Sequence, residues 1–153
     1  MRKIILILFA LVAFSVSSQE LRNDTIDCGN FQLIISLPDL SIRKVQTERY
    51  EEGFYKIYSL AFGSSLHKSS RPPQIIVHFG FNAELVLPEP DRIIYNCKLG
   101  NVANSIYFSS AGEYFRRDNY PQYSLCVIFC YISKDNLELA NYILDNLRIY
   151  RLH

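Results

Sequence analysis

The sequence predicts an α+β fold, in which a mostly antiparallel sheet carries one C-terminal helix packed on it. Short apolar runs, bounded by Gly, Pro or polar turn residues, follow one another along the chain. One later segment has the three- and four-residue period of an amphipathic helix. The 153 residues also include 11 Tyr and 10 Phe, and aromatic side chains favour strands. Strands in sequence followed by a helix are typical of an antiparallel α+β sandwich.

The apolar runs have the length of strands. Pro38 ends the first run and Gly63 ends the second, since both residue types interrupt strand pairing. Strands are therefore expected at residues 31–37, 54–62, 74–81, 93–99, 105–109, 123–132 and 148–150.

The polar stretches between these runs are expected to have other structures. Residues 19–27 read as a loose lead-in, and residues 40–52 as a short helix or an irregular crossing. Residues 64–73, which are rich in Ser and contain paired Pro, predict an exposed loop. Residues 116–121 predict a polar corner.

The segment after residue 132 is expected to form the helix. Ser133 can cap its N-terminus, and Asp135 in the first turn complements the helix dipole. One apolar stripe is expected to lie on the sheet. This stripe comprises Leu137, Ala140, Ile143, Leu144 and Leu147.

The start of the chain has the layout of a secretory signal peptide. Arg2 and Lys3 precede an unbroken apolar run at 4–14, and Val16 and Ser18 are small residues placed for cleavage. The run is too short to cross a bilayer, which takes about 20 apolar residues.

We therefore expect residues 1–18 to be a signal peptide and residues 19–153 to form a single exported domain, periplasmic or extracellular, with no membrane anchor. Without Arg2 and Lys3 the basic count falls from 16 to 14, against 15 acidic residues. A nearly neutral domain has no electrostatic footprint for nucleic acid. The expected partner is another protein.

The cysteines Cys28, Cys97, Cys126 and Cys130 are first interpreted as disulfide partners, because exported proteins fold under oxidising conditions. If residues 123–132 form one strand, Cys126 and Cys130 lie about 13 Å apart on one face. A bridge requires roughly 4.4–6.8 Å between Cα atoms. Either Cys28 and Cys97 each meet one of these two, or one bridge forms and two thiols stay buried. No pair has the close spacing of a zinc site.

The histidines give no catalytic motif. His67 lies in the predicted loop beside Ser64, Ser65, Ser69 and Ser70. No Gly-x-Ser-x-Gly elbow surrounds any serine. His78 lies inside an apolar strand, where a hydrogen-bonded, partly buried imidazole is expected. We therefore predict no catalytic residue, no metal and no cofactor.

One polar corner has the composition of a binding surface. Arg and Tyr are favoured at protein interfaces. The corner contains Arg116, Arg117 and Tyr120, and Tyr114 lies just before it. These four side chains are the predicted binding residues, for an anion or a protein partner.

The two ends of the domain resemble the Mog1/PsbP-like family. An apolar strand closes on proline at residues 31–38, and a long strand leads into a Ser-Lys-Asp helix that ends in Leu147-Arg148-Ile149. The resemblance implies a Mog1/PsbP-like sandwich. It also implies a binding or assembly factor, because the family shares no catalytic residues.

These observations predict a small exported, non-catalytic binding or interaction domain. Narrower forms of this hypothesis are an immunity-type protein, which neutralises a toxin, and an assembly factor. The alternative is a secreted enzyme. It would be a hydrolase using His67 or His78, or a thiol redox protein using Cys126 and Cys130.

Overall fold

The structure is a computed structural model that describes residues 20–39, 42–61, 71–80, 87–99 and 103–152. The strands are β1 (Leu21–Asp27), β2 (Phe31–Pro38), β3 (Ile42–Tyr50), β4 (Gly53–Leu60), β5 (Gln74–Gly80), β6 (Arg92–Leu99), β7 (Ala103–Ser110), β8 (Glu113–Tyr120), β9 (Leu125–Ile132) and β10 (Arg148–Arg151). The helix α2 spans Leu137–Asp145, and the 3-10 turns η2 and η3 span Pro121–Tyr123 and Lys134–Asn136. The expected α+β class is confirmed.

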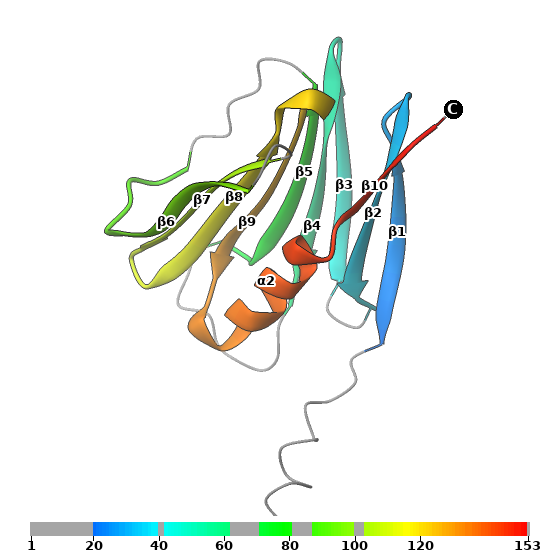
Figure 1. The fold of residues 1–153 in the computed structure, drawn as a ribbon. Coiled ribbons are helices and arrows are strands. Elements are labelled where there is room, and N and C mark those ends of the chain that lie inside the picture. The colour runs from blue at the N-terminus through cyan, green and yellow to red at the C-terminus, as the bar shows by residue number, and fades with distance from the viewer. Residues whose placement is uncertain (1–19, 40–41, 62–70, 81–86, 100–102, 153) are drawn as a thin grey trace, which may run out of the picture.

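The strands form two antiparallel sheets (Figure 1). The smaller sheet has the order β1-β2-β10, and the larger has the order β3-β4-β5-β9-β8-β7-β6. Residues from the smaller sheet, from α2 and from one face of the larger sheet share a single apolar core. The smaller sheet and the helix therefore cover the same face of the larger sheet, which we call its inner face.

Alternation along the strands builds this core. Leu33, Ile35 and Leu37 of β2 are fully buried, whereas the residues between them are partly exposed. Val77 and Phe129 face them from the larger sheet. Apolar burial of this kind is worth about 25 cal/mol per Å² of surface removed from water.

The other face of the larger sheet, its outer face, carries a second buried cluster. Ile76, Ile128 and Cys130 belong to it, and Leu87 packs against it. Alternate residues of β9 thus enter the inner and outer clusters. This explains why β9 is apolar along its whole length, as strands buried on both faces are.

The predicted strands overlap β2, β4, β5, β6, β7, β9 and β10. Three polar stretches that were expected to lack strands in fact contain them. Residues 19–27 hold β1, residues 40–52 hold β3, and the corner at 116–121 belongs mostly to β8. Both β1 and β3 lie at sheet edges, where a strand does not need two apolar faces.

The helix begins later than the sequence indicated. Ser133 precedes the 3-10 turn η3, and its hydroxyl accepts a hydrogen bond from Asn136 Nδ2 at 2.9 Å instead of capping a backbone N–H. The predicted stripe is confirmed: Ala140, Ile143 and Leu144 are buried, and the two flanking leucines pack against the same core.

Over the described ranges, we find no helix with the length and apolar character needed to cross a membrane.

Candidate binding pocket

A pocket of about 510 Å³ lies between one end of the smaller sheet and the neighbouring end of the larger sheet. Sites for small ligands typically measure about 300–1,000 Å³. The turn between β1 and β2 and the end of β10 supply one side of the pocket. The end of β5, the turn between β3 and β4, and η2 supply the other.

Three aromatic rings form an apolar wall of this pocket, which Leu152 also lines. Phe31 of β2 lies at the centre, with its ring centroid 5.7 Å from that of Phe79 and 5.0 Å from that of Tyr123. Phe31 is buried, whereas Phe79 and Tyr123 remain partly exposed toward the pocket. Edge-to-face and tilted rings attract one another, so the three rings form a stable apolar wall with accessible ring surface.

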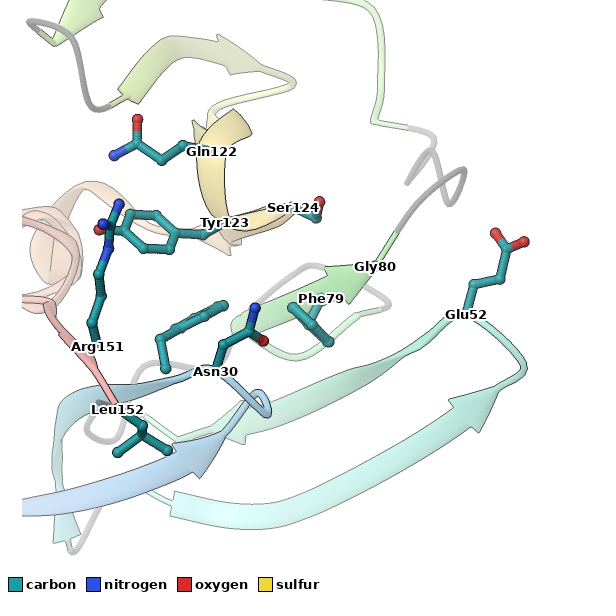
Figure 2. A pocket seen from close by; sticks show the side chains of 10 residues that line it. Asn30, Glu52, Phe79, Gly80, Gln122, Tyr123, Ser124, Arg151 and Leu152 are labelled. Carbon is teal, nitrogen blue, oxygen red and sulfur yellow. The ribbon is translucent and has the colours of Figure 1, made fainter.

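Charged groups of opposite sign flank the rings (Figure 2). The Arg151 guanidinium lies over the Tyr123 ring, with Cζ 5.7 Å from the centroid, as cation–π pairs do. Glu52 lies at the opposite side of the pocket. Both side chains are exposed, so each is accessible to a ligand.

Three further polar side chains of the pocket are available for hydrogen bonding to a ligand. Within the described residues, no hydrogen bond engages the side chains of Asn30, Gln122 or Ser124. Two amides and a hydroxyl therefore stand beside an apolar wall with their donors and acceptors open. This combination is usual for sites that fix a ligand's orientation.

The backbone of the pocket requires a glycine. Gly80 has φ +121°, and its N–H donates to the carbonyl of Ser124 at 2.9 Å. A Cβ at Gly80 would collide with the backbone oxygen of Glu52. Any other residue would therefore force the turn between β3 and β4 to shift relative to β5.

The four predicted binding residues do not form one surface. Arg116 is only 4% exposed, and Tyr114 and Tyr120 pack beside the inner core. Arg117 lies in register with Ile128 of the outer cluster. Strand alternation separates neighbours in sequence onto opposite faces, so the corner expected at residues 116–121 is divided by the sheet.

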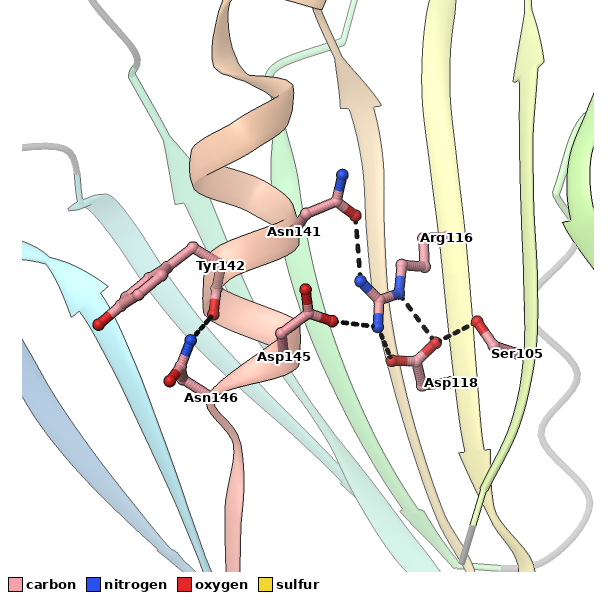
Figure 3. A network of polar contacts seen from close by, with 7 residues as sticks. All are labelled: Ser105, Arg116, Asp118, Asn141, Tyr142, Asp145 and Asn146. Carbon is pink, nitrogen blue, oxygen red and sulfur yellow. Dashed lines mark hydrogen bonds and ion pairs between the residues drawn. The ribbon is translucent and has the colours of Figure 1, made fainter. Parts of the chain in front are cut away.

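Arg116 is the centre of an internal polar network (Figure 3). Its Nη2 donates to Asp118 at 2.7 Å and also lies 2.7 Å from Asp145, while Nη1 donates to Asn141 at 3.0 Å. Ser105 donates its hydroxyl to Asp118 at 2.6 Å. The network joins β7 and β8 to α2. The guanidinium of Arg116 thus has a structural role, because it holds these elements together.

Arg117 differs from its neighbour. Its Nε is buried, and among the described residues it is the one buried side-chain nitrogen or oxygen without a hydrogen-bond partner.

His78 belongs to a different cluster, on the outer face. Its Nε2 lies 2.5 Å from the hydroxyl of Tyr50, which also lies 3.1 Å from the carbonyl of Phe79. The ring stacks on Tyr55 at 4.5 Å. Burial lowers the pKa of His78 below its ordinary value of 6.5. No described carboxylate or serine hydroxyl bonds to this imidazole, which matches the expected hydrogen-bonded, buried histidine.

Cys126 and Cys130 lie on one face of β9, as expected, in register with His78 and Gln74. The expected bridge from either of them is absent, because Cys28, Cys126 and Cys130 are all free thiols. Cys28 is part of the inner core, whereas Cys126 and Cys130 pack in the outer cluster. The larger sheet therefore separates Cys28 from the other two. The side chain of Cys97, on β6, lies outside the described part of the structure.

The free thiols have the properties of buried apolar groups. Burial raises the pKa of Cys28, Cys126 and Cys130 to about 12. The thiolate is the reactive form, so these thiols stay protonated and unreactive near pH 7.

The remaining candidates are not described. His67 and its four neighbouring serines lie within residues 62–70, outside the described part. Within the described ranges, no group of three or more His, Cys, Asp or Glu is placed to hold a metal ion.

We find no match for this chain among protein-family models, curated proteins or solved structures. The resemblance to the Mog1/PsbP-like family therefore stays a prediction.

Sequence reasoning missed the pocket because its residues come from five separate segments. One local signal was present. Gly80 interrupts an apolar strand, and such a glycine often marks a close approach of another backbone.

Proposed function

We propose that this protein is an exported, non-catalytic binding domain whose ligand occupies the pocket between the ends of the two sheets. The observation that carries the proposal is the wall of Phe31, Phe79 and Tyr123, with accessible ring surface beside uncommitted polar groups. Large apolar side chains that stay accessible in a concave site gain free energy when a ligand removes them from water.

The chemistry elsewhere in the described structure supports binding over catalysis. A nucleophilic thiol requires a lowered pKa, and the pKa of Cys126 and Cys130 is raised. A catalytic histidine requires a base or nucleophile within hydrogen-bond reach. The imidazole of His78 instead bonds to a tyrosine that is tied to the backbone.

We also propose that the partner is another protein, since the pocket joins an aromatic wall to amide groups that match a peptide. The immunity-type and assembly-factor forms of the proposal share this pocket and differ in the partner. Export rests on the signal-like residues 1–18, and loss of these residues from protein made in the native host, measured by mass spectrometry, tests it.

The pocket is tested with a minimal peptide mimic, N-acetylphenylalanine methylamide, in an NMR titration of the ¹⁵N-labelled domain. We expect shifts confined to the amides of the pocket segments, such as Gly80, Gln122 and Leu152. Tyr123→Ala should weaken binding about threefold to tenfold, because aromatic pairs are worth about 0.5–1.5 kcal/mol.

The matched control is Tyr142→Ala. Tyr142 is 47% exposed on α2 and does not line the pocket. It should leave binding unchanged. Shifts spread over distant strands, or equal effects of the two substitutions, would argue against the pocket as the binding site.

A further inference from the structure

The edge of β10 that faces away from β2 has unpaired backbone groups. β10 ends the order β1-β2-β10, so within the described residues it has a strand neighbour on one side only. In an antiparallel pair, the N–H and C=O of alternate residues point toward the partner strand. The residues between them point outward. A single hydrogen bond therefore identifies which residues of β10 point outward.

That hydrogen bond is made by Leu152, whose N–H donates to the carbonyl of Asn30 at 3.0 Å. Residue 152 therefore points toward β2, and its neighbour Arg151 points away. The opposite strand agrees: Arg151 is in register with Phe31, whose carbonyl accepts from Cys28 on the other side of β2. The N–H and C=O of Arg151 thus lie on the open edge.

This edge borders the pocket. Arg151 and Phe31 are cross-strand partners and share a face, and both line the pocket. A strand added beside β10 would place the side chain opposite Arg151 on the same face. That side chain would enter the pocket toward the rings of Phe31 and Tyr123.

The charge of β10 selects the added strand. Its sequence is Arg-Ile-Tyr-Arg, with both arginines exposed and no acidic residue. Complementary charges steer association and fix register. Arg148 and Arg151 are three positions apart and therefore lie on opposite faces of β10. If the aromatic residue of the added strand lies opposite Arg151, an acidic residue three positions from it would lie opposite Arg148. An acidic residue two positions from it would be a diagonal neighbour of Arg151 on the pocket face.

We propose that the domain captures an extended, acidic segment of another protein by β-strand addition to the open edge of β10, with one aromatic side chain inserted in the pocket. This inference rests on the proposed function, because it uses the same pocket and adds the mode of binding and the class of partner. In such recognition the main chain supplies affinity and a pocket supplies specificity.

The first experiment selects binders from a library of random linear hexapeptides displayed on phage, with the whole mature domain as bait. We expect enrichment of peptides with one aromatic residue and acidic residues two or three positions away from it. A selected peptide is then synthesised with and without an N-methyl group on the aromatic residue or on either neighbour. The methyl group that removes a hydrogen bond to Arg151 should weaken binding about threefold to tenfold.

The second experiment removes the hydrogen bond from the protein side. Arg151→Pro deletes the outward N–H, which an edge strand tolerates, and Arg151→Ala deletes only the side chain. We expect Arg151→Pro to bind the selected peptide several-fold more weakly than Arg151→Ala. Amide hydrogen exchange gives a further measurement on the unmutated protein. The N–H of Arg151 should exchange fast in the free protein and slowly when the peptide is bound. The N–H of Leu152, which donates to Asn30, should stay protected in both states. Protection of Leu152 in Arg151→Pro shows that β10 is still paired.

The outcomes separate the two proposals. If no peptide is enriched, or if N-methylation at every position and Arg151→Pro have no effect, strand addition is overturned. Binding of N-acetylphenylalanine methylamide in the pocket would then leave the proposed function standing. If the Arg151 amide is already protected in a dimer of the free protein, the edge belongs to a second copy of the chain and the inference is wrong. If neither the mimic nor any peptide binds, both proposals fail.

Discussion

A single buried arginine shows how one side chain can hold several elements in place. Arg116 and Asp118 are 4% and 1% exposed and lie 2.7 Å apart. Burying two charges costs several kcal/mol per ion, and the cost is recovered only when the pair is close and fully hydrogen-bonded. Ser105 and Asn141 complete the hydrogen bonding. If one partner is removed, the free-energy cost of burying the other charge is therefore no longer offset.

We predict that Arg116→Ala destabilises the domain by about 3–5 kcal/mol, because Asp118 is left buried without a counter-charge. Asp145→Ala is the matched control at the same guanidinium. Since Asp145 is 58% exposed, its loss should cost at most about 1 kcal/mol. Urea denaturation of the three proteins measures both values. If the two substitutions lowered the free energy of unfolding equally, the buried Arg116–Asp118 pair would contribute no more to stability than the exposed contact with Asp145.

At the scale of secondary-structure elements, α2 is the element whose face was most clearly specified by its sequence. Ala140, Ile143 and Leu144 recur at helical spacing and are buried, and Leu144 is only 2% exposed. Leu144→Ala should cost about 2–5 kcal/mol, the range for buried leucines. Tyr142→Ala, 47% exposed on the same helix, should cost little. Chemical denaturation tests the pair, and a cost below about 0.5 kcal/mol for Leu144→Ala would place the stripe at the surface.

The strands differ in how far their sequences specify them. β5 and β9 are apolar, and their runs predicted strands directly because both faces of the larger sheet are buried. β8 reads as a polar corner, since its inward positions include Arg116 and Asp118, which satisfy one another. Only the paired structure shows that these charges are neutralised. β3 has exposed residues along nearly its whole length, so it lacks the alternation that identifies a half-buried strand.

The candidate pocket could not be predicted from the sequence, because it too depends on contacts between distant segments. Phe31, Phe79 and Tyr123 come from three elements, and no spacing in the chain relates them. Their meeting depends on how the smaller sheet packs against the larger one. Motif searches detect groups fixed by local geometry, whereas this pocket is fixed by the packing of two sheets.

For the whole molecule, the relation between the sheets is therefore the decisive feature. Besides the apolar core, polar contacts at Asp24 join them. Asp24 of β1 accepts hydrogen bonds from Lys56 Nζ at 2.7 Å and from the Tyr58 hydroxyl at 2.6 Å, both on β4. Burial alone would raise the pKa of Asp24, but the hydrogen bonds from Lys56 and Tyr58 outweigh it, so the pKa is lowered from 3.8.

A carboxyl group whose pKa is lower in the folded state stabilises that state at pH values above its unfolded pKa. The stabilisation is lost as the pH falls below 3.8 and through the folded value. We therefore predict that Asp24→Asn lowers the free energy of unfolding by about 1.5–3 kcal/mol near pH 7, as expected for a hydrogen-bonded charged group. The difference from wild type should shrink once the pH falls below 3.8.

The measurement is urea denaturation of both proteins from neutral to acidic pH, with Asp39→Asn as the control carboxylate. Asp39 pairs with Arg22 at 3.7 Å and is about half exposed, so its loss should cost at most about 1 kcal/mol. A pH-independent difference for Asp24→Asn would show that packing, and not the charge on Asp24, is what holds β1 against β4. The pocket lies between the ends of the same two sheets. If the charge on Asp24 helps to hold these sheets together, Asp24→Asn should lower the affinity of the pocket at Phe31 and Phe79 for a peptide as well as the stability of the domain.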